Sequence, residues 1–209
     1  MPRTARIVIP GAAHHITQRG NDRQSVFFDD EDHRKYLELL RLFGEEFSLR
    51  VIAYCLMKNH VHVVAVPGFE SSLADTIGRT HQQYTAYFQE KYSRSGHLWQ
   101  SRFFSCPMDE SHAMNALAYV ELNPVRAGIE VEPWLYPWSS AQAHAGLRGD
   151  RLLDLTRWFG QFTVEGWVET LGGKREDTDL VRDIRRHTQR GKPWGSDPSF
   201  LKKARKCGA

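Results

Sequence analysis

The stretch AYCLMKNHVHVVAVP, residues 53–67, predicts the centre of the fold and carries its strongest functional pattern. Its valines favour an extended strand. Side chains two positions apart point to the same face of a strand, so His60 and His62 project together. Residues 49–57 form an apolar run typical of a partner strand, and two polar residues link the runs tightly. The stretch therefore predicts a hairpin that presents two imidazoles to a divalent ion.

The patterns on either side of this hairpin complete an α+β order. Residues 12–18 and 102–107 are typical of strands, and residues 29–47 and 71–91 carry apolar residues at helical spacing. Strand, helix, strand, strand, helix and strand is the order of a ferredoxin-like antiparallel sheet. We expect the helices to lie on one face of that sheet, within a catalytic domain that spans residues 1–130.

A Trp-rich and basic extension is expected over residues 131–209, after a helix that starts near Asp109 or Ser111. Tryptophans 134, 138, 158 and 167 stand among prolines and glycines, which is typical of a wrapped segment with small helices. Residues 172–209 carry 11 Lys and Arg against 5 Asp and Glu, although the net charge of the chain is only +3. A basic segment attracts phosphate backbones without reading sequence, but this charge is equally typical of a solvated tail.

The composition is typical of a globular protein of the cytoplasm. With 41% hydrophobic residues, the 209-residue chain can fill a core. No apolar run approaches the roughly 18 residues of a membrane span, and the N-terminus lacks the apolar centre of a secretory signal. Cys55, Cys106 and Cys207 form no CxxC pair, which argues against a disulfide framework or a cysteine zinc site. We therefore expect a reducing compartment and no membrane partner.

Tyr119 and Asn123 are the candidate partners of the histidines. They are four residues apart, so on a helix they share one face. A phenol becomes a useful nucleophile when a base or a cation stabilises the charge that develops in its attack. A metal held by His60, His62 and the side-chain oxygen of Asn123 would polarise a phosphoryl group, and these donors suit Mg²⁺ or Mn²⁺. The predicted product is a covalent phosphotyrosine bond.

Other interpretations of the same residues stay open. A His-x-His pair on a strand is also typical of packed or surface histidines, and a tyrosine near a helix end is typical of a core. A small metal-dependent hydrolase would use the histidines with Glu121 or Asp109. Glu121 lies two positions from Tyr119, so we expect it to face away as an exposed charge.

If the basic segment binds a phosphate backbone, the candidate contacts with nucleic acid are polar, basic or aromatic side chains in four places. Trp99 could stack on a base or belong to the core, and its polar neighbours could line a cleft or only solvate a strand. The candidates lie in the first loop, on the second helix, around Trp99 and in the basic tail: Arg19, Asn21, Arg23, Arg79, His81, Gln82, Trp99, Gln100, Arg102, Arg185, Arg186, Arg190, Lys192, Lys202 and Lys203.

Four ordered motifs resemble one known family. HHITQRGNDRQSVFF, AYCLMKNHVHVV, GHLWQSRFF and AYVELNPVRAGI are similar to the signatures of the REP-associated tyrosine transposases, a branch of the HUH single-tyrosine transposases. RGKPWGS, residues 190–196, is similar to the tail of the longer members. The resemblance covers most of the chain.

The resemblance implies a ferredoxin-like enzyme that cleaves and rejoins single-stranded DNA near REP-like hairpins. Tyr119 would attack to leave a 5′-phosphotyrosine and a free 3′-hydroxyl, with a divalent metal on His60 and His62. Related insertion-sequence transposases usually place Gln where this chain has Asn123, which is one methylene shorter. The same branch implies a monomer. An alternative on this scaffold is a non-catalytic protein that binds repeat hairpins.

Overall fold

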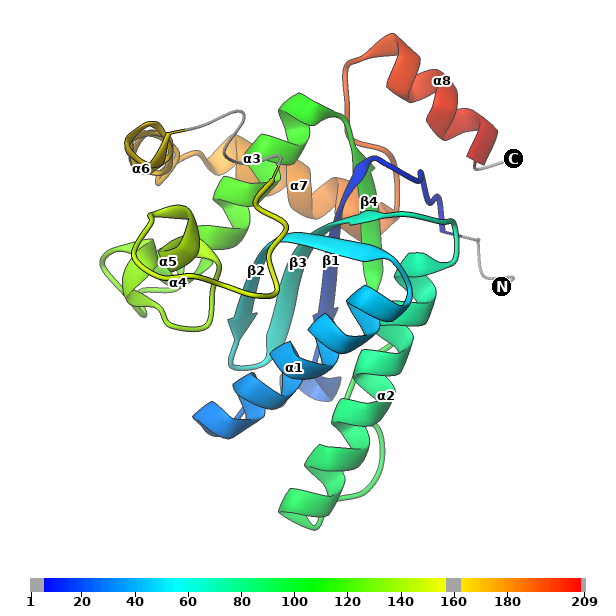
Figure 1. Cartoon of the computed structure of the whole chain (residues 1–209), viewed down its shortest axis with the longest axis vertical. Coiled ribbons are helices and arrows are strands. Elements are labelled where there is room, and N and C mark those ends of the chain that lie inside the picture. Colours follow the sequence, from blue (N-terminus) through cyan, green and yellow to red (C-terminus); the bar gives the residue numbers. More distant parts are fainter. Residues whose placement is uncertain (1–5, 157–162, 208–209) are drawn as a thin grey trace.

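The computed structural model describes residues 6–156 and 163–207, and its centre is a four-stranded antiparallel sheet (Figure 1). The strands lie in the order β2-β3-β1-β4. They are β1 (Ala13–Arg19), β2 (Leu49–Met57), β3 (His60–Pro67) and β4 (Phe104–Met108). Helix α1 (Asp30–Glu46) connects β1 to β2, and α2 (Ser72–Tyr92) connects β3 to β4. The predicted α+β fold is therefore confirmed, with the strand order expected of a ferredoxin-like sheet.

The register of the sheet places both histidines on one face. Strand β3 pairs with β2 on one side and with β1 on the other, where Arg19 lies opposite His60. Because alternate residues of a strand point to opposite faces, His60 and His62 share a face with Val64. Val61 belongs to the core on the other face, which is the one covered by α1 and α2.

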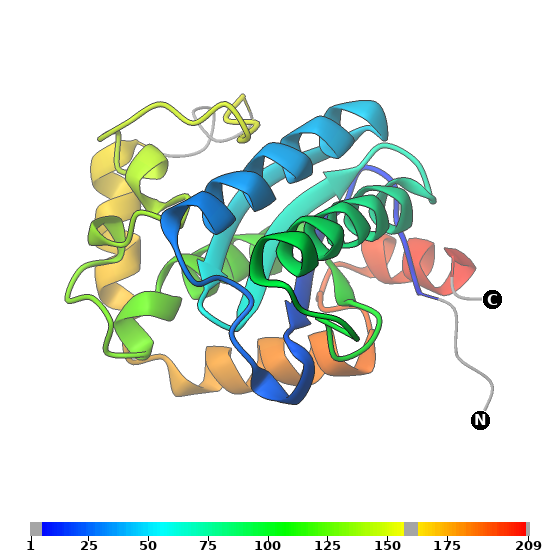
Figure 2. The same cartoon turned by 90° about the horizontal axis from the view of Figure 1, so that it is seen from below.

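Helices cover both faces of the sheet: the two helices expected to share one face do so, and later helices cover the other face. Helices α1 and α2 lie together on one face (Figure 2). The other face is covered by α3 (Glu110–Glu121) and by α7 (Thr178–Arg190). The reason lies in β3 itself, whose valines are apolar on both faces. A strand of this composition leaves no face for solvent, as in sheets with two covered faces.

The basic tail is folded and docked against the sheet. Leu180 and Ile184 of α7 are buried in the core beneath α3. The backbone N–H of Trp194 donates to the carbonyl of Pro107 in β4 at 2.9 Å. Trp158 of the predicted extension lies outside the described residues, and the domain boundary near residue 130 stays a prediction.

The remaining helical elements are short. They are η1 (Asn21–Arg23), α4 (Asn123–Arg126), η2 (Pro133–Leu135), α5 (Ala141–His144), α6 (Val164–Gly173) and α8 (Pro198–Cys207). Across residues 6–156 and 163–207, no helix is both long and apolar enough to cross a membrane.

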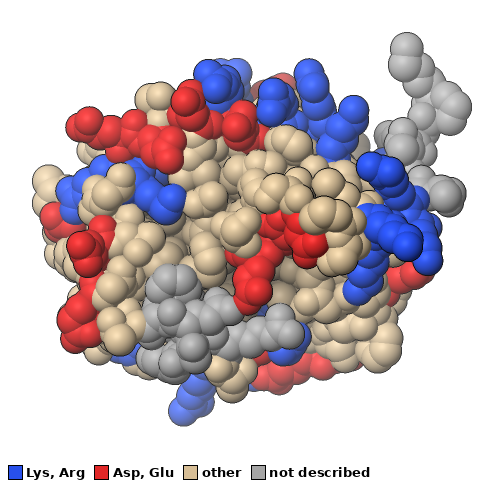
Figure 3. Space-filling model, turned by 90° about the horizontal axis from the view of Figure 1, so that it is seen from above, with Lys and Arg blue, Asp and Glu red and all other residues tan. Residues whose placement is uncertain are grey.

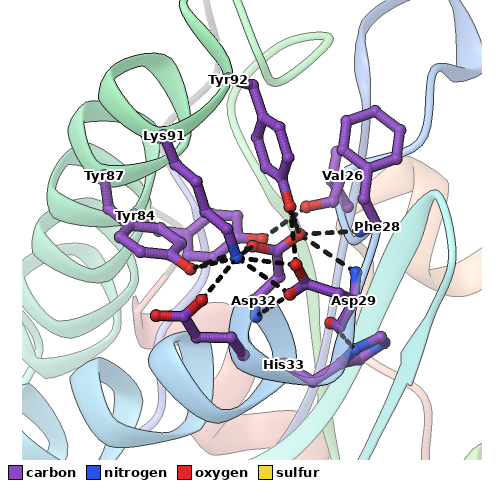
Figure 4. Close-up of polar contacts among 10 residues, drawn as sticks. Val26, Phe28, Asp29, Asp32, His33, Tyr84, Tyr87, Lys91 and Tyr92 are labelled. Atoms are coloured by element: carbon purple, nitrogen blue, oxygen red, sulfur yellow. Dashed lines mark hydrogen bonds and ion pairs between the residues drawn. The ribbon is translucent and has the colours of Figure 1, made fainter.

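Lys91, near the end of α2, ties this helix to the start of α1 (Figure 4). Its Nζ lies 2.8, 2.9 and 3.0 Å from carboxylate oxygens of Asp29, Glu31 and Asp32. The Asp32 side chain is buried and also accepts a hydrogen bond from the Tyr92 hydroxyl at 2.8 Å. Asp29 caps α1 by accepting from the Asp32 N–H. The hydrogen bond from Lys91, and then that from the Asp32 N–H, lowers the pKa of Asp29 to about 2.

Lys91→Met should lower the free energy of unfolding by about 2 kcal/mol, because Asp32 would stay buried without its cation. Lys35→Met is the matched control, since the Lys35–Glu38 pair is exposed and should contribute less than about 0.5 kcal/mol. The folded-state pKa of Asp29 is depressed, so the ionised Asp29 contributes to the free energy of unfolding above pH 3.8. This contribution is lost as the pH falls toward 2. Urea titrations at pH 7 and pH 3 measure both effects. Equal midpoints for Lys91→Met and the wild type would contradict this account.

Candidate active site

Two histidine rings lie next to each other at the start of β3. The ring centroids of His60 and His62 are 5.0 Å apart. Nδ1 of His60 lies 2.7 Å from Oδ1 of Asn59, and Nδ1 of His62 lies 2.9 Å from Nε2 of His15. Within the described residues, neither Nε2 atom has a hydrogen-bond partner. Each ring therefore keeps one nitrogen for a ligand.

Both imidazoles are neutral near pH 7. Burial, followed by the charges of Arg19 and Arg185, lowers the pKa of His60 to about 4. Burial also lowers the pKa of His62 well below its ordinary value, with smaller contributions from the neighbouring histidines and from the charges of Arg126 and Arg19. The neutral imidazole is the form that binds a metal ion.

Tyr119 of α3 lies beside these histidines. Its ring centroid is 5.5 Å from that of His62 and 5.7 Å from that of His15, in both cases edge to face. Nε of Arg185, from α7, donates to the Tyr119 hydroxyl at 3.4 Å. The guanidinium carbon of Arg126 lies 4.5 Å from the centroid of the same ring. The phenol, only 2% exposed, is thus surrounded by two imidazoles and two guanidinium groups.

Arg126 brings unpaired donors to this site. Burial lowers the pKa of its guanidinium to about 10, and the interaction with Tyr119 partly offsets this effect. One terminal nitrogen donates to the backbone carbonyl of Tyr119. Nε and the other terminal nitrogen are buried without a hydrogen-bond partner among the described residues. Buried hydrogen-bond donors usually have a partner. Because a planar guanidinium matches the geometry of phosphate oxygens, these two donors are suited to hydrogen-bond a bound phosphate.

Asn123 lies at the break between α3 and α4. Helix α3 ends at Glu121, and the short α4 begins at Asn123. Pro124 has no N–H to offer the carbonyl four residues earlier, and the Asn123 side-chain amide donates to this Val120 carbonyl at 3.2 Å. The 7%-exposed amide thereby satisfies a carbonyl that the proline leaves free. Its Oδ1 has no hydrogen bond within the described residues, and its role as a metal ligand stays a prediction.

The donors fit a divalent ion of the kind that the sequence predicts. Two neutral imidazoles with free Nε2 atoms and one amide oxygen are nitrogen and oxygen ligands suited to such an ion. Over residues 6–156 and 163–207, no group of three or more His, Cys, Asp or Glu side chains is placed to hold a metal. The candidate site therefore has no carboxylate from the described residues, and the positive charges nearby disfavour a bare cation.

Glu121 is buried, so the expectation of an exposed charge is wrong. Its side chain is 0% exposed and accepts hydrogen bonds from Ser140 at 2.5 Å and from the Trp167 indole at 2.9 Å. Nδ1 of His144 makes a further ion-pair contact with it. Glu121 does face away from Tyr119, but α5 and α6 cover that side of α3. Sequence spacing alone does not reveal such coverage.

The two carboxylates of the hydrolase hypothesis lie elsewhere. Glu121 is engaged by α5 and α6, as above. Asp109 caps α3 by accepting from the His112 N–H at 3.0 Å and also accepts from the Ser196 N–H at 2.7 Å. Within the described residues, neither carboxylate contacts His60 or His62, which disfavours a hydrolase built from these groups.

The predicted DNA contacts in two loops lie at the same end of the sheet as His60. The Gln100 N–H donates to the Arg19 carbonyl at 2.9 Å, and the Asn21 N–H donates to the Leu98 carbonyl at 2.8 Å. Asn21, Gln100 and Arg102 line one shallow groove, and Arg23 is exposed in the first loop. The two loops are thus joined to each other at the end of the sheet where Arg19 lies opposite His60, and Trp99, together with Thr85 of α2, lines the same groove.

The predicted contacts on α2 lie on the opposite face of the sheet. His81 is hydrogen-bonded to the Tyr36 hydroxyl at 3.0 Å, and its ring stacks on Trp99 with centroids 4.3 Å apart. Trp99 packs against the core of that face. Arg79 and Gln82 are exposed on the same helix. The structure does not place these α2 side chains with His60 and His62, and contacts of theirs with DNA stay a prediction.

The predicted contacts of the tail fall into two groups. Arg185, Arg186 and Arg190 line a groove on α7. Lys192 follows α7, and Lys202 and Lys203 are exposed on α8. Figure 3 shows Lys and Arg side chains gathered at one edge of the face that it presents. Within the described residues, only Arg185 of this set contacts Tyr119.

Three residues of the site were not predicted to belong to it. His15, Arg126 and Thr188 have no role in the interpretation of the motifs alone; Thr188 belongs to α7, and its hydroxyl lies 2.7 Å from Nδ1 of His15. Arg126 does stand seven positions after Tyr119 within AYVELNPVRAGI, and His15 stands in the strand predicted over residues 12–18. The antiparallel register with β3 is the signal that could have identified His15.

The sheet, the histidine pair and the neighbouring tyrosine agree with the HUH single-tyrosine class to which the motifs point. A family model described as "Transposase IS200 like" matches residues 9–123. The chain belongs to this family of IS200-like transposases. The family assignment confirms the resemblance drawn from the four motifs.

Two of the similar proteins are described as REP-associated tyrosine transposases. A protein of Haemophilus influenzae described in this way is 28% identical over 106 residues, which cover 44% of this chain and 60% of that protein. The match thus spans less than two thirds of the relative's length. A solved structure of a REP-associated tyrosine transposase bound to a REP hairpin aligns with a TM-score of 0.56 and 16% identity, over 75% of this chain and 96% of that chain. At this identity the likeness shows the fold.

A transposase structure from Deinococcus radiodurans is a weaker match. It aligns with a TM-score of 0.41 and 17% identity, over 57% of this chain and 96% of that chain. This alignment adds nothing to the assignment.

Proposed function

We propose that the protein is a metal-dependent endonuclease and strand transferase of single-stranded DNA that acts near hairpins. The observation that supports it most is that His60, His62 and Tyr119 meet on one face of the sheet, with Arg126 and Arg185 against the phenol. A nucleophile, donors for a divalent ion and cations for a phosphate are thus close together. These groups all come from one chain, which supports a monomer.

The proposed reaction is an exchange of phosphodiester bonds. The Tyr119 oxygen attacks a backbone phosphorus, and an O–P bond to tyrosine forms as the P–O3′ bond breaks. The phenol proton is lost to solvent and a solvent proton reaches the departing 3′-oxygen, so that a 3′-hydroxyl and a 5′-phosphotyrosine result. Attack by a 3′-hydroxyl on this linkage reverses the step and joins strands.

Charge stabilisation would come from the arginines and the ion. Arg185 donates to the phenolic oxygen, and Arg126 has buried donors free for a phosphate oxygen. Fixed positive groups aimed at developing charge are among the largest contributions to catalysis. Mg²⁺ or Mn²⁺, held by His60, His62 and Asn123, would act as a Lewis acid on the phosphoryl group.

The proposed partner is a REP-like hairpin next to single-stranded DNA. The solved relative that shares this fold is bound to a REP hairpin. The groove lined by Asn21, Gln100 and Arg102 lies at the histidine end of the sheet and could receive the strand beside the hairpin. Phosphate contacts position such a strand, whereas contacts with base edges select its sequence.

A labelled hairpin oligonucleotide with a single-stranded flank tests the proposal. With Mn²⁺ or Mg²⁺, we expect a protein–DNA adduct that survives denaturation and is absent when the metal is chelated. Tight hairpin binding without an adduct or cleavage under any metal would instead support the non-catalytic hairpin-binding protein.

Arg185→Gln should slow adduct formation about 100-fold, the scale of removing one donor to developing charge. Arg182→Gln is the matched control, because Arg182 also lies on α7 but pairs with Asp179 at 2.9 Å and was not predicted to contact DNA. Its rate should stay within a few-fold of the wild type. Single-turnover kinetics on the hairpin compare the two variants, and equal losses would mean that both arginines act only as general phosphate contacts.

A further inference from the structure

His15 of β1 lies between the candidate ligand His62 and the helix α7. Its Nε2 is 2.9 Å from Nδ1 of His62, and its Nδ1 is 2.7 Å from Oγ1 of Thr188. The planes of the two imidazole rings are within 9° of parallel, as expected for rings joined by a hydrogen bond between their nitrogens. The exposed fractions of Thr188, His15 and His62 are 2%, 1% and 5%. Three buried polar groups thus form one continuous hydrogen-bonded chain.

This series of hydrogen bonds allows two arrangements of protons, because each neutral imidazole has one N–H and one bare nitrogen. In the first, His62 donates from Nδ1 to Nε2 of His15, and His15 donates from Nδ1 to the Thr188 hydroxyl. In the second, the Thr188 hydroxyl donates to Nδ1 of His15, and His15 donates from Nε2 to Nδ1 of His62. Nε2 of His62 then carries the proton of that ring. Only the first arrangement leaves Nε2 of His62 bare and able to bind a metal.

The charges around His62 favour the first arrangement. Arg126 lies against the Tyr119 ring that contacts His62, and Arg19 stands opposite His60 in the neighbouring strand. A bare ring nitrogen is the negative end of the imidazole dipole, whereas an N–H is its positive end. A positive environment therefore favours a bare Nε2, and a bound divalent ion requires it.

We propose that Thr188 and His15 form a positioning relay that holds His62 in the Nδ1–H tautomer and presents its Nε2 to the divalent ion. The relay rests on the proposed function for the identity of that ion. His15 and Thr188 contact neither ion nor DNA in this role, so they are positioning residues. Because Thr188 lies on α7, the C-terminal region takes part in orienting a metal ligand of β3.

Loss of the relay should weaken metal binding. His15→Phe keeps a flat ring against His62 but removes the acceptor for its Nδ1–H. Loss of such a partner typically reduces metal affinity 10- to 100-fold. His15→Gln retains a side-chain acceptor and should recover part of this loss. Thr188→Val, which removes only the hydroxyl, should have a smaller effect in the same direction.

The control is Thr170→Val. Thr170 also lies in a helix of the C-terminal region, but its hydroxyl donates to the carbonyl of Gly166 at 2.7 Å. It should bind Mn²⁺ as the wild type does. Thermal unfolding of each variant identifies any that fail to fold, and His15→Gln and Thr188→Val keep the test valid if His15→Phe does not fold.

Two measurements test the relay without relying on cleavage. Nitrogen-15 NMR of labelled histidine, assigned with His62→Gln, should show a protonated Nδ1 and a bare Nε2 for His62 in the metal-free wild type. Electron paramagnetic resonance with Mn²⁺ and the hairpin oligonucleotide should show the affinity losses above. A protonated Nε2 on His62, an unchanged Mn²⁺ affinity in both His15→Phe and Thr188→Val, or no Mn²⁺ binding by the wild type would each overturn the relay.

The two proposals can fail separately. If the wild type shows the expected tautomer and Mn²⁺ affinities but forms no DNA adduct, the relay stands and the proposed nuclease activity is wrong. If an adduct forms while His62 carries its proton on Nε2, the relay is wrong and the nuclease activity stands.

Discussion

Tyr119→Phe should abolish the covalent protein–DNA adduct and strand cleavage while hairpin binding is retained. The substitution removes only the hydroxyl that would attack phosphorus. We expect no other nucleophile to take its place in the chemical step. Loss of a nucleophile typically reduces the rate by at least about a thousand-fold. The ring can keep its packing against His15, His62 and Arg126. Denaturing gels with labelled hairpin DNA measure adduct and cleavage, and filter binding measures affinity.

Tyr87→Phe is the control for loss of a tyrosine hydroxyl. Tyr87 lies on α2, and its hydroxyl donates to Asp32 at 3.1 Å on the other side of the sheet. This variant should form the adduct at the wild-type rate. Cleavage by Tyr119→Phe at a wild-type rate would show that another group attacks the phosphate.

His60→Ala and His62→Ala should each reduce cleavage by at least about a hundred-fold in saturating Mg²⁺, because a metal held by one imidazole loses both affinity and orientation. Hairpin affinity should change by less than a few-fold, since arginine and lysine contacts with phosphates supply most of it. Single-turnover cleavage and filter binding separate the two effects.

His112→Ala is the control for removal of an imidazole. His112 belongs to the first turn of α3, where its ring pairs with Asp109 at 2.5 Å, and its loss should leave cleavage within a few-fold of the wild type. Equal losses of binding and cleavage in His60→Ala and His62→Ala would indicate that these histidines stabilise the fold instead of holding an ion.

Local sequence patterns predicted the strands of the central sheet closely. They did not predict which helices cover the second face of the sheet. Strand β2 has the predicted bounds, because an apolar run ends at the polar turn before His60. Helix α1 begins after Asp29, whose capping geometry is encoded within four residues. The covering of the second face depends on α7, which follows β3 by more than 100 residues. No local periodicity carries that information.

The candidate site was predictable where its residues stand in short motifs. His60 and His62 share a face because a strand alternates, and this is a local property. The contact between His15 and Thr188 joins residues 173 positions apart, so only the tertiary fold brings them together. Glu121 illustrates the same limit, since its partners on α5 and α6 lie outside the motif that contains it.

Trp99 and His81 show how one pattern can hold two interpretations. Trp99 lies in a loop and His81 on α2, and both have aromatic rings compatible with stacking on a base. In the folded chain they stack on each other beside Tyr36. Burial of an aromatic ring depends on what packs over it, and the sequence of the loop does not contain that neighbour.

The most direct test of the account is to identify the atom that links the protein to DNA. The wild type is incubated with Mn²⁺ and a hairpin oligonucleotide, the adduct is isolated under denaturing conditions, and its peptides are sequenced by mass spectrometry after nuclease and protease digestion. We expect a nucleotide joined through its 5′-phosphate to the Tyr119 peptide, with a free 3′-hydroxyl on the released strand. A nucleotide on any other residue, or cleaved DNA with a 5′-phosphate and no attached peptide, would contradict it.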